Sequence, residues 1–216
     1  MPGKHQVSVS LRVFLTSVRE SSELLQAVDK IRQDAPRGRV VLPRTRFQLV
    51  AELAYLQLYL SWEEFLEESF VRYFCGSRSP NGTTYPRLIK PKDNDSARAF
   101  LFANRRYLDW TDHSAIVRIA ETVFQNGGPF ATLSSSSRTL TDMKKIRNRI
   151  THRSQSARNE FEDVVRQQLG SMPRPVLNAG AFLVTEKPAT TSGVQRESFF
   201  EYYSRSIGVL ATLVAP

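Results

Sequence analysis

Apolar residues recur with the period of an α-helix along most of the chain. In residues 8–33 they return every three or four positions, which predicts an amphipathic helix that could be interrupted near Ser21. Pro and Gly break this pattern in residues 34–43. Residues 44–75 then resume it up to Gly76, a residue that favours a helix C-terminal cap. This second segment is apolar on more than one side, so we expect it at the centre of the fold.

The rest of the chain carries shorter helical patterns. Helices are predicted over residues 96–104, 112–125, 139–155, 157–169 and 195–213. The serines at 134–137 are typical N-terminal capping residues for the helix that follows. The segment after residue 170 is irregular and predicts a short strand at 181–185.

We therefore predict an all-α fold with one domain over residues 1–216. Its core would cover about residues 45–170, preceded by the helix at 8–33. A partly irregular C-terminal extension over 171–216 would end in a helix.

Composition is that of an ordinary globular protein, with 216 residues, 41% of them hydrophobic and 24% charged. The single cysteine, Cys75, excludes an internal disulfide and a cysteine-rich zinc site. No apolar run approaches the ~20 residues needed to cross a bilayer. The first residues also lack the apolar core of a signal peptide, so we expect a cytoplasmic protein without a membrane partner.

Charge narrows the choice of partner. The net charge is +9 and the sequence pI is about 10.0, a balance that favours polyanions, most commonly nucleic acid. Residues 138–158 hold seven Lys or Arg and one acid, whereas residues 51–75 hold five Glu and one Arg. The positive charge is therefore concentrated around the helix predicted at 139–155.

On a helical wheel of this segment one side is apolar, and it comprises Leu140, Met143, Ile146 and Ile150. Arg147 falls roughly 45° from the centre of that side. Because an unpaired buried charge is costly, its guanidinium must reach solvent, form a pair or line a polar cleft.

His152 follows Arg147 by five residues, so the two would lie roughly 140° apart on a straight helix. Asn148 and His152, four residues apart, would share a face. A joint site of Arg147 and His152 needs a helix that ends or bends near Thr151, or a second chain that supplies another copy.

The run Arg-Asn-Arg-Ile-Thr-His at 147–152 resembles the R-x-x-x-x-H signature of HEPN domains. The aromatic-rich helix at 53–74, the "RRYLDW" stretch at 105–110 and "GGPF" at 127–130 resemble the RiboL-PSP-type HEPN group. This resemblance covers roughly residues 45–170. One HEPN subgroup carries a tyrosine two residues after the histidine as a target for antitoxin modification, but here Ser154 stands at that position.

The resemblance implies a helical bundle that commonly forms homodimers in which two motifs meet at the interface. It implies a metal-independent endoribonuclease of a prokaryotic conflict or stress system, whose products end in a cyclic phosphate. An antitoxin or regulatory protein would be a further partner.

Under this hypothesis His152 transfers protons, because histidine titrates near neutral pH, and Arg147 binds the phosphate with its planar donor groups. Asn148 would orient one of these groups or the substrate. Basic residues on the same segment would attract the RNA backbone, namely Lys144, Lys145, Arg149 and Arg153. No metal or cofactor is implied, since the histidines are far apart and no metal-binding spacing stands near the basic segment.

Several other residues carry a structural interpretation beside a functional one. Glu64 could support catalysis or pair with Arg147, although a solvated acidic helix face is the more common arrangement. Tyr107 and Trp110 could stack on bases, yet aromatic residues at this spacing more often pack in a core. Gly127 and Gly128 are too short a pair for a phosphate-binding loop and favour a helix stop.

Two other classes of function stay open. The chain could be a HEPN module that binds RNA or DNA without catalysis. It could also be an interaction protein, for example an immunity or antitoxin partner whose basic helix meets an acidic chain.

Overall fold

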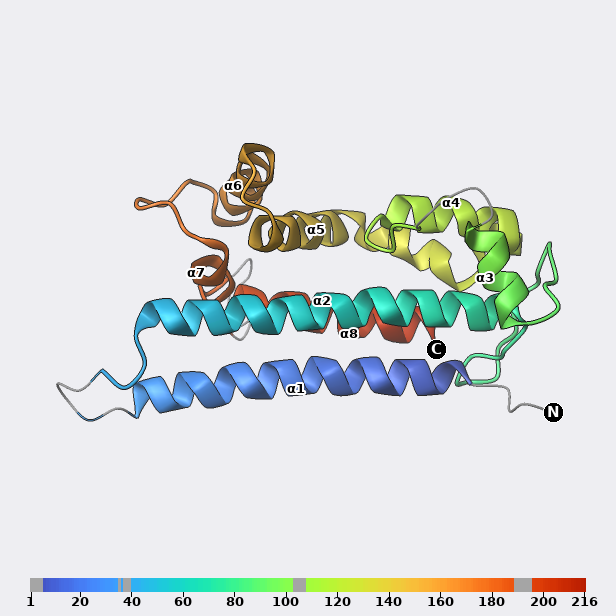
Figure 1. Ribbon diagram of the computed structural model, residues 1–216, viewed down its shortest axis with the longest axis horizontal. Coiled ribbons are helices and arrows are strands. Elements are labelled where there is room, and N and C mark those ends of the chain that lie inside the picture. The colour runs from blue at the N-terminus through green and yellow to red at the C-terminus, as the bar shows by residue number, and fades with distance from the viewer. Residues whose placement is uncertain (1–5, 35, 37–39, 103–107, 189–195) are drawn as a thin grey trace. The chain divides into compact units, whose positions relative to one another are not determined.

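The computed structural model describes residues 6–34, 36, 40–102, 108–188 and 196–216 (Figure 1). The described residues contain helices and two isolated β-bridges but no β-sheet, which confirms the all-α prediction. The α-helices are α1 (Val7–Gln33), α2 (Arg44–Phe74), α3 (Asn94–Phe102), α4 (His113–Val123), α5 (Ser137–Thr151), α6 (Gln155–Leu169), α7 (Ala179–Leu183) and α8 (Phe199–Val214), and the 3₁₀ helix is η1 (Gln125–Ser136). No helix in this part of the chain is long and apolar enough to cross a membrane.

The two longest helices agree closely with the hydrophobic pattern. Helix α1 continues through Ser21 without the interruption that the sequence allowed. Helix α2 ends at Phe74, and Gly76 adopts a φ of +88°. The Ser77 amide then donates to the Arg72 carbonyl at 2.9 Å. The predicted glycine cap is therefore confirmed, because the left-handed conformation of Gly76 lets the chain leave the helix while the Ser77 amide satisfies one of its last carbonyls.

The strand predicted at 181–185 is wrong, because these residues belong to the short helix α7 and the turn that follows it. The Asn178 side chain caps this helix by accepting from the Ala181 amide at 2.7 Å. Its amide nitrogen also donates to Gln48 Oε1 of α2 at 3.1 Å. Tertiary contact with α2 thus stabilises a helix too short to be recognised from its own periodicity.

The serines at 134–137 do not cap α5 from outside, contrary to the prediction. Helix η1 runs directly into α5, and the Ser137 amide already donates to the Ser134 carbonyl. The preceding helix supplies the acceptors that a cap would otherwise provide. The predicted helix stop is confirmed just upstream, where Gly127 and Gly128 have φ values of +73° and +53° after the end of α4.

The chain divides into two compact units. The first comprises residues 1–16, 61–140 and 207–216, and the second comprises residues 17–60 and 141–206. Helices α1, α2, α5 and α8 each contribute residues to both.

An aromatic cluster forms the core of the first unit. The Phe70 ring lies 4.7 Å from that of Phe130, 5.4 Å from that of Phe124 and 5.7 Å from that of Trp110, measured between centroids. The Tyr73 hydroxyl donates to the Val214 carbonyl at 3.0 Å, which attaches the end of α8 to α2. These contacts bury the large apolar area that stabilises this unit.

A second aromatic cluster holds the helices of the other unit. Phe182 of α7 stacks on Phe199 of α8 with centroids 4.2 Å apart, and its edge meets Phe161 of α6 at 5.7 Å. Tyr203 of α8 packs against Tyr55 of α2 at 6.4 Å. The basic part of α5 belongs to this unit.

Candidate functional site

Helix α5 is fixed to its unit through its apolar side. Met143 and Ile146 are fully buried, whereas Ile150 near the end of the helix is only half-buried. The hydroxyl of buried Tyr55 donates to the Met143 carbonyl at 3.0 Å. Burial, followed by the nearby Tyr203, raises the pKa of Tyr55 well above its usual value, so this hydroxyl stays a donor. The long sequence separation of this contact explains why periodicity could not reveal it.

Asp142 is the one acid of the basic segment, and its carboxylate does not lie on the surface. The residue is only 3% exposed. Its Oδ2 accepts a hydrogen bond from Gln168 Nε2 of α6 at 2.8 Å. The contact joins α5 to α6, a role that the sequence analysis missed. Because this negative charge is buried and bonded, the solvent-facing side of α5 is more purely basic than the residue count suggested.

Helix α5 ends at Thr151, close to the point where a joint site of Arg147 and His152 within one chain would need it to end. Thr151 is the last helical residue, and its hydroxyl donates back to the Arg147 carbonyl at 3.0 Å. His152 and Arg153 then lead to Ser154, which caps α6 by accepting from the Ala157 amide at 3.2 Å. His152 is exposed in this short link. The position two residues after the histidine therefore serves as a helix cap.

The backbone of His152 still closes the last turn of α5. Its amide donates to the Asn148 carbonyl at 2.8 Å. The Cα of His152 therefore keeps the helical register, and the offset of roughly 140° from Arg147 persists within one chain. Of the two routes to a joint site, a second copy of the motif remains the simpler one.

Arg147 is half-buried, and Asn148 holds its side chain. Nη1 of Arg147 donates to Asn148 Oδ1 at 3.2 Å. Among the residues that the structure describes, no carboxylate forms an ion pair with Arg147. Its remaining donors can therefore meet phosphate oxygens, which match the planar guanidinium.

The predicted RNA-binding residues lie before and after Arg147 and Asn148 in the chain, and they differ in how far they are buried. Lys144, Lys145 and Arg149 are half-buried on α5, and Arg153 is exposed after it. Arg149 Nη1 lies 3.5 Å from the His152 carbonyl, at the limit of a hydrogen bond. The six-residue motif and its basic neighbours thus form one continuous segment, which we call the α5 end (residues 144–153).

Other predicted residues lie elsewhere. Glu64 is exposed on the part of α2 that belongs to the first unit, and its supporting role stays a prediction. Trp110 is only 2% exposed and packs against Phe70, so it is a core residue and cannot stack on a base. Tyr107 lies outside the described residues. His113 binds the Ser137 hydroxyl at 2.8 Å through Nε2.

No group of three or more His, Cys, Asp or Glu residues in the described ranges is arranged to bind a metal ion.

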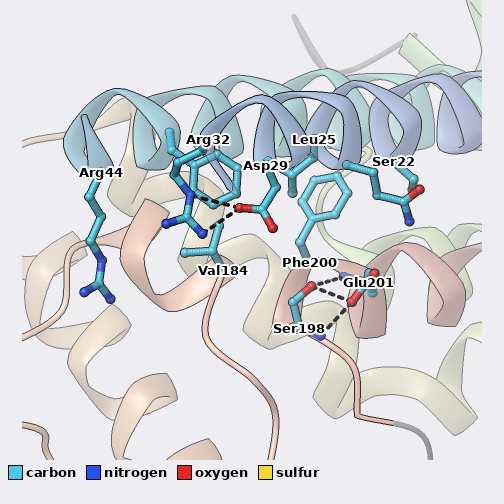
Figure 2. Close-up of a pocket in the computed structure, with 11 residues that line it drawn as sticks. Ser22, Leu25, Asp29, Arg32, Arg44, Val184, Ser198, Phe200 and Glu201 are labelled. Atoms are coloured by element: carbon cyan, nitrogen blue, oxygen red, sulfur yellow. Dashed lines mark hydrogen bonds and ion pairs between the residues drawn. The ribbon is translucent and has the colours of Figure 1, made fainter. Parts of the chain in front are cut away.

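A cavity of about 420 Å³ lies in the second unit (Figure 2). Asp29 and Arg32 of α1 form an ion pair at 2.7 Å on its wall. The Arg32 guanidinium also lies over the Phe47 ring, 5.1 Å from its centroid. On the side of α8, Glu201 accepts hydrogen bonds from the amide and hydroxyl of Ser198. These polar groups satisfy one another, and no residue of the α5 end lines the cavity.

Comparisons of the chain with protein-family models, with curated proteins and with solved structures gave no match.

Proposed function

We propose that this protein is a metal-independent endoribonuclease of the HEPN type, with Arg147 and His152 as its catalytic residues. The observation that carries the proposal is the arrangement at the end of α5. Half-buried Arg147 forms no ion pair with a carboxylate of the described residues, and exposed His152 is the first residue after the helix. Both belong to the basic stretch of residues 138–158, whose one acid, Asp142, is buried and hydrogen-bonded to Gln168.

The chemistry needs only these residue types because RNA carries its own nucleophile. The 2′-hydroxyl attacks the neighbouring phosphorus, the bond to the 5′-oxygen breaks, and a 2′,3′-cyclic phosphate forms. One imidazole takes the proton of the 2′-hydroxyl, and a protonated group supplies the proton to the leaving oxygen. Arg147 stabilises the charge that develops on the phosphate oxygens. Asn148 acts as a positioning residue through its hydrogen bond to the guanidinium.

A homodimer completes the proposed site. Within one chain, the Asn148–His152 backbone hydrogen bond extends the helical register to His152, which offsets it from Arg147 by roughly 140° around the axis. Two copies related by a two-fold axis could place the arginine of one beside the histidine of the other.

Binding of RNA would come from the remaining cations of the α5 end. Lys144, Lys145, Arg149 and Arg153 can each neutralise a backbone phosphate. For single-stranded RNA, four such contacts give a slope of about −3 in a plot of log affinity against log salt. Replacing Arg153 by Ala should make that slope shallower by about 0.7.

The proposal is tested by RNA cleavage in excess chelator. His152→Ala should slow cleavage by about 10²–10⁴-fold, the usual contribution of a proton-transfer group, with little loss of RNA affinity. Arg153→Ala is the matched control, since it should weaken binding but not abolish cleavage. Equal cleavage by the wild type and by His152→Ala would overturn the assignment.

Mixing two inactive variants tests the composite site. Arg147→Ala and His152→Ala proteins combined should regain part of the activity, because a mixed dimer contains one intact pair. A mixture as inactive as its components would place the complete site within one chain.

Exposure of His152 also favours a second function, a nucleic-acid-binding module without catalysis. No described side chain hydrogen-bonds to the imidazole of His152, so its orientation is not fixed as that of a buried catalytic group would be. This alternative predicts a strong salt dependence of binding and no cleavage at any protein concentration. An interaction protein, the third class, would bind a partner chain regardless of His152.

A further inference from the structure

Helix α2 exposes a row of leucines on the side that faces away from its buried residues. Leu49, Leu53 and Leu60 are 53%, 57% and 54% exposed, respectively, and Leu56 is half-buried. Successive leucines are four, three and four residues apart, so all four fall within an arc of about 60° on the helix. We call residues 49–60 on this side the leucine face. Its spacing is that of a coiled-coil seam, which normally packs against another helix.

The opposite side of α2 already has its partners. Ala51, Ala54, Tyr55 and Leu58 are all buried. Tyr55, which binds α5 through the Met143 carbonyl, points about 130° away from the centre of the leucine face. The leucine face is therefore a different surface from the one that holds the catalytic helix.

We propose that the leucine face binds the leucine face of a second copy of this chain, with the two α2 helices antiparallel. In this register Leu49 meets Leu60 of the second copy, and Leu53 meets Leu56. Both contacts occur twice because the two-fold axis makes the interface self-complementary.

Charges at the two ends of the face select the antiparallel direction. Arg46 and Glu64 are exposed, and their separation of 18 residues equals five helical turns, so both lie on one flank of the leucine face. Neither has an ion-pair partner among the described residues. Antiparallel pairing brings Arg46 of one copy next to Glu64 of the other, whereas parallel pairing would oppose like charges.

The contact is short, because the leucine face extends only about 17 Å along the helix at 1.5 Å per residue. We therefore expect association that depends on protein concentration. It does not rest on the proposed RNA cleavage, because α5 lies on another side of α2. If copies also pair through the α5 end, the two interfaces together would build an assembly larger than a dimer.

The test is sedimentation equilibrium of the full chain over a range of concentrations. Leu53→Asp should halve the associated mass at a concentration where the wild type is assembled. Leu24→Asp is the matched control, because Leu24 of α1 is similarly exposed, at 51%, and lies outside the leucine face. It should leave the mass unchanged. A monomeric wild type, or equal dissociation by both variants, would overturn the proposal.

A charge exchange tests the direction of pairing. Arg46→Glu and Glu64→Arg should each weaken association by about tenfold, since each places like charges together at two symmetric positions. The double variant should restore association to near the level of the wild type, because the pairs are re-formed with reversed signs. Failure of the double variant to recover would overturn the antiparallel arrangement. Loss of RNA cleavage in Leu53→Asp with normal folding would show that the two surfaces are not separate.

Discussion

Replacing Gly180 by alanine should destabilise the protein severely although the change adds a single methyl group. Gly180 of α7 lies against the backbone of α2. A Cβ atom there would stand 2.7 Å from the carbonyl carbon of Gln48 and 3.0 Å from its Cα, and would be closer still to the carbonyl oxygen. Neither helix can yield by rotating a side chain, because all three atoms are backbone.

The cost follows from two terms. Forcing the two helices apart costs about 1–3 kcal/mol, as for other overpacked contacts. The Gly180 amide also donates to Glu52 Oε1 at 2.9 Å, and α7 cannot move without breaking this bond. A hydrogen bond to a charged group contributes about 1.5–3 kcal/mol. Alanine recovers at most about 1 kcal/mol through its better helix propensity. The net loss should be about 2–5 kcal/mol.

Urea denaturation followed by circular dichroism measures this loss, and Gly208→Ala in α8 is the control. A Cβ at Gly208 would meet nothing within 4 Å, so this substitution should stabilise the protein by about 0.5–1 kcal/mol. Changes of opposite sign in the free energy of unfolding for Gly180→Ala and Gly208→Ala would support the close contact of α7 with α2. The reasoning fails if Gly180→Ala is as stable as the wild type or is stabilised like Gly208→Ala.

Two further predictions concern other contacts. Tyr55→Phe leaves the Met143 carbonyl without its buried partner and should lower the free energy of unfolding by about 1–2 kcal/mol; an unchanged denaturation midpoint would refute this. Asp93 caps α3, and its hydrogen bonds with Ser96 lower the pKa of its carboxyl group below the usual value. Since the folded pKa is depressed, this stabilisation is present above about pH 4 and is lost as the pH falls through the folded value. Denaturation at several pH values should show that Asp93→Ala has a lower free energy of unfolding than the wild type at pH 7 and the same value near pH 2. A difference that persists at pH 2 would contradict this prediction.

Local signals in the sequence were sufficient for the long helices and their ends. The apolar period placed α1 and α2 to within one residue, and Gly76 marked the end of α2 because its left-handed conformation is a local requirement. The same reasoning failed at α7. Its five residues depend on Gln48 and Glu52, about 130 residues earlier in the chain, for their hydrogen bonds.

The candidate site shows the same division between local and long-range information. The motif at 147–152 and its basic neighbours are contiguous, so the sequence alone identified them. Local reasoning could not show that Asp142 is buried against Gln168, nor that Tyr55 fixes α5, because both contacts join distant segments. Nor could the pattern decide which apolar side of α2 is covered, since that helix is apolar on more than one side.

The most direct test of the proposed activity is analysis of the product ends after incubation of the protein with an RNA pool in excess chelator. A matched oligonucleotide with a 2′-deoxy sugar at the cleaved position serves as the comparison. The account predicts cleavage of the RNA to a 2′,3′-cyclic phosphate and a free 5′-hydroxyl, with the deoxy-substituted strand intact. Cleavage of the deoxy-substituted strand at the same position would contradict attack by the 2′-hydroxyl. An RNA pool left wholly intact would contradict the nuclease assignment itself.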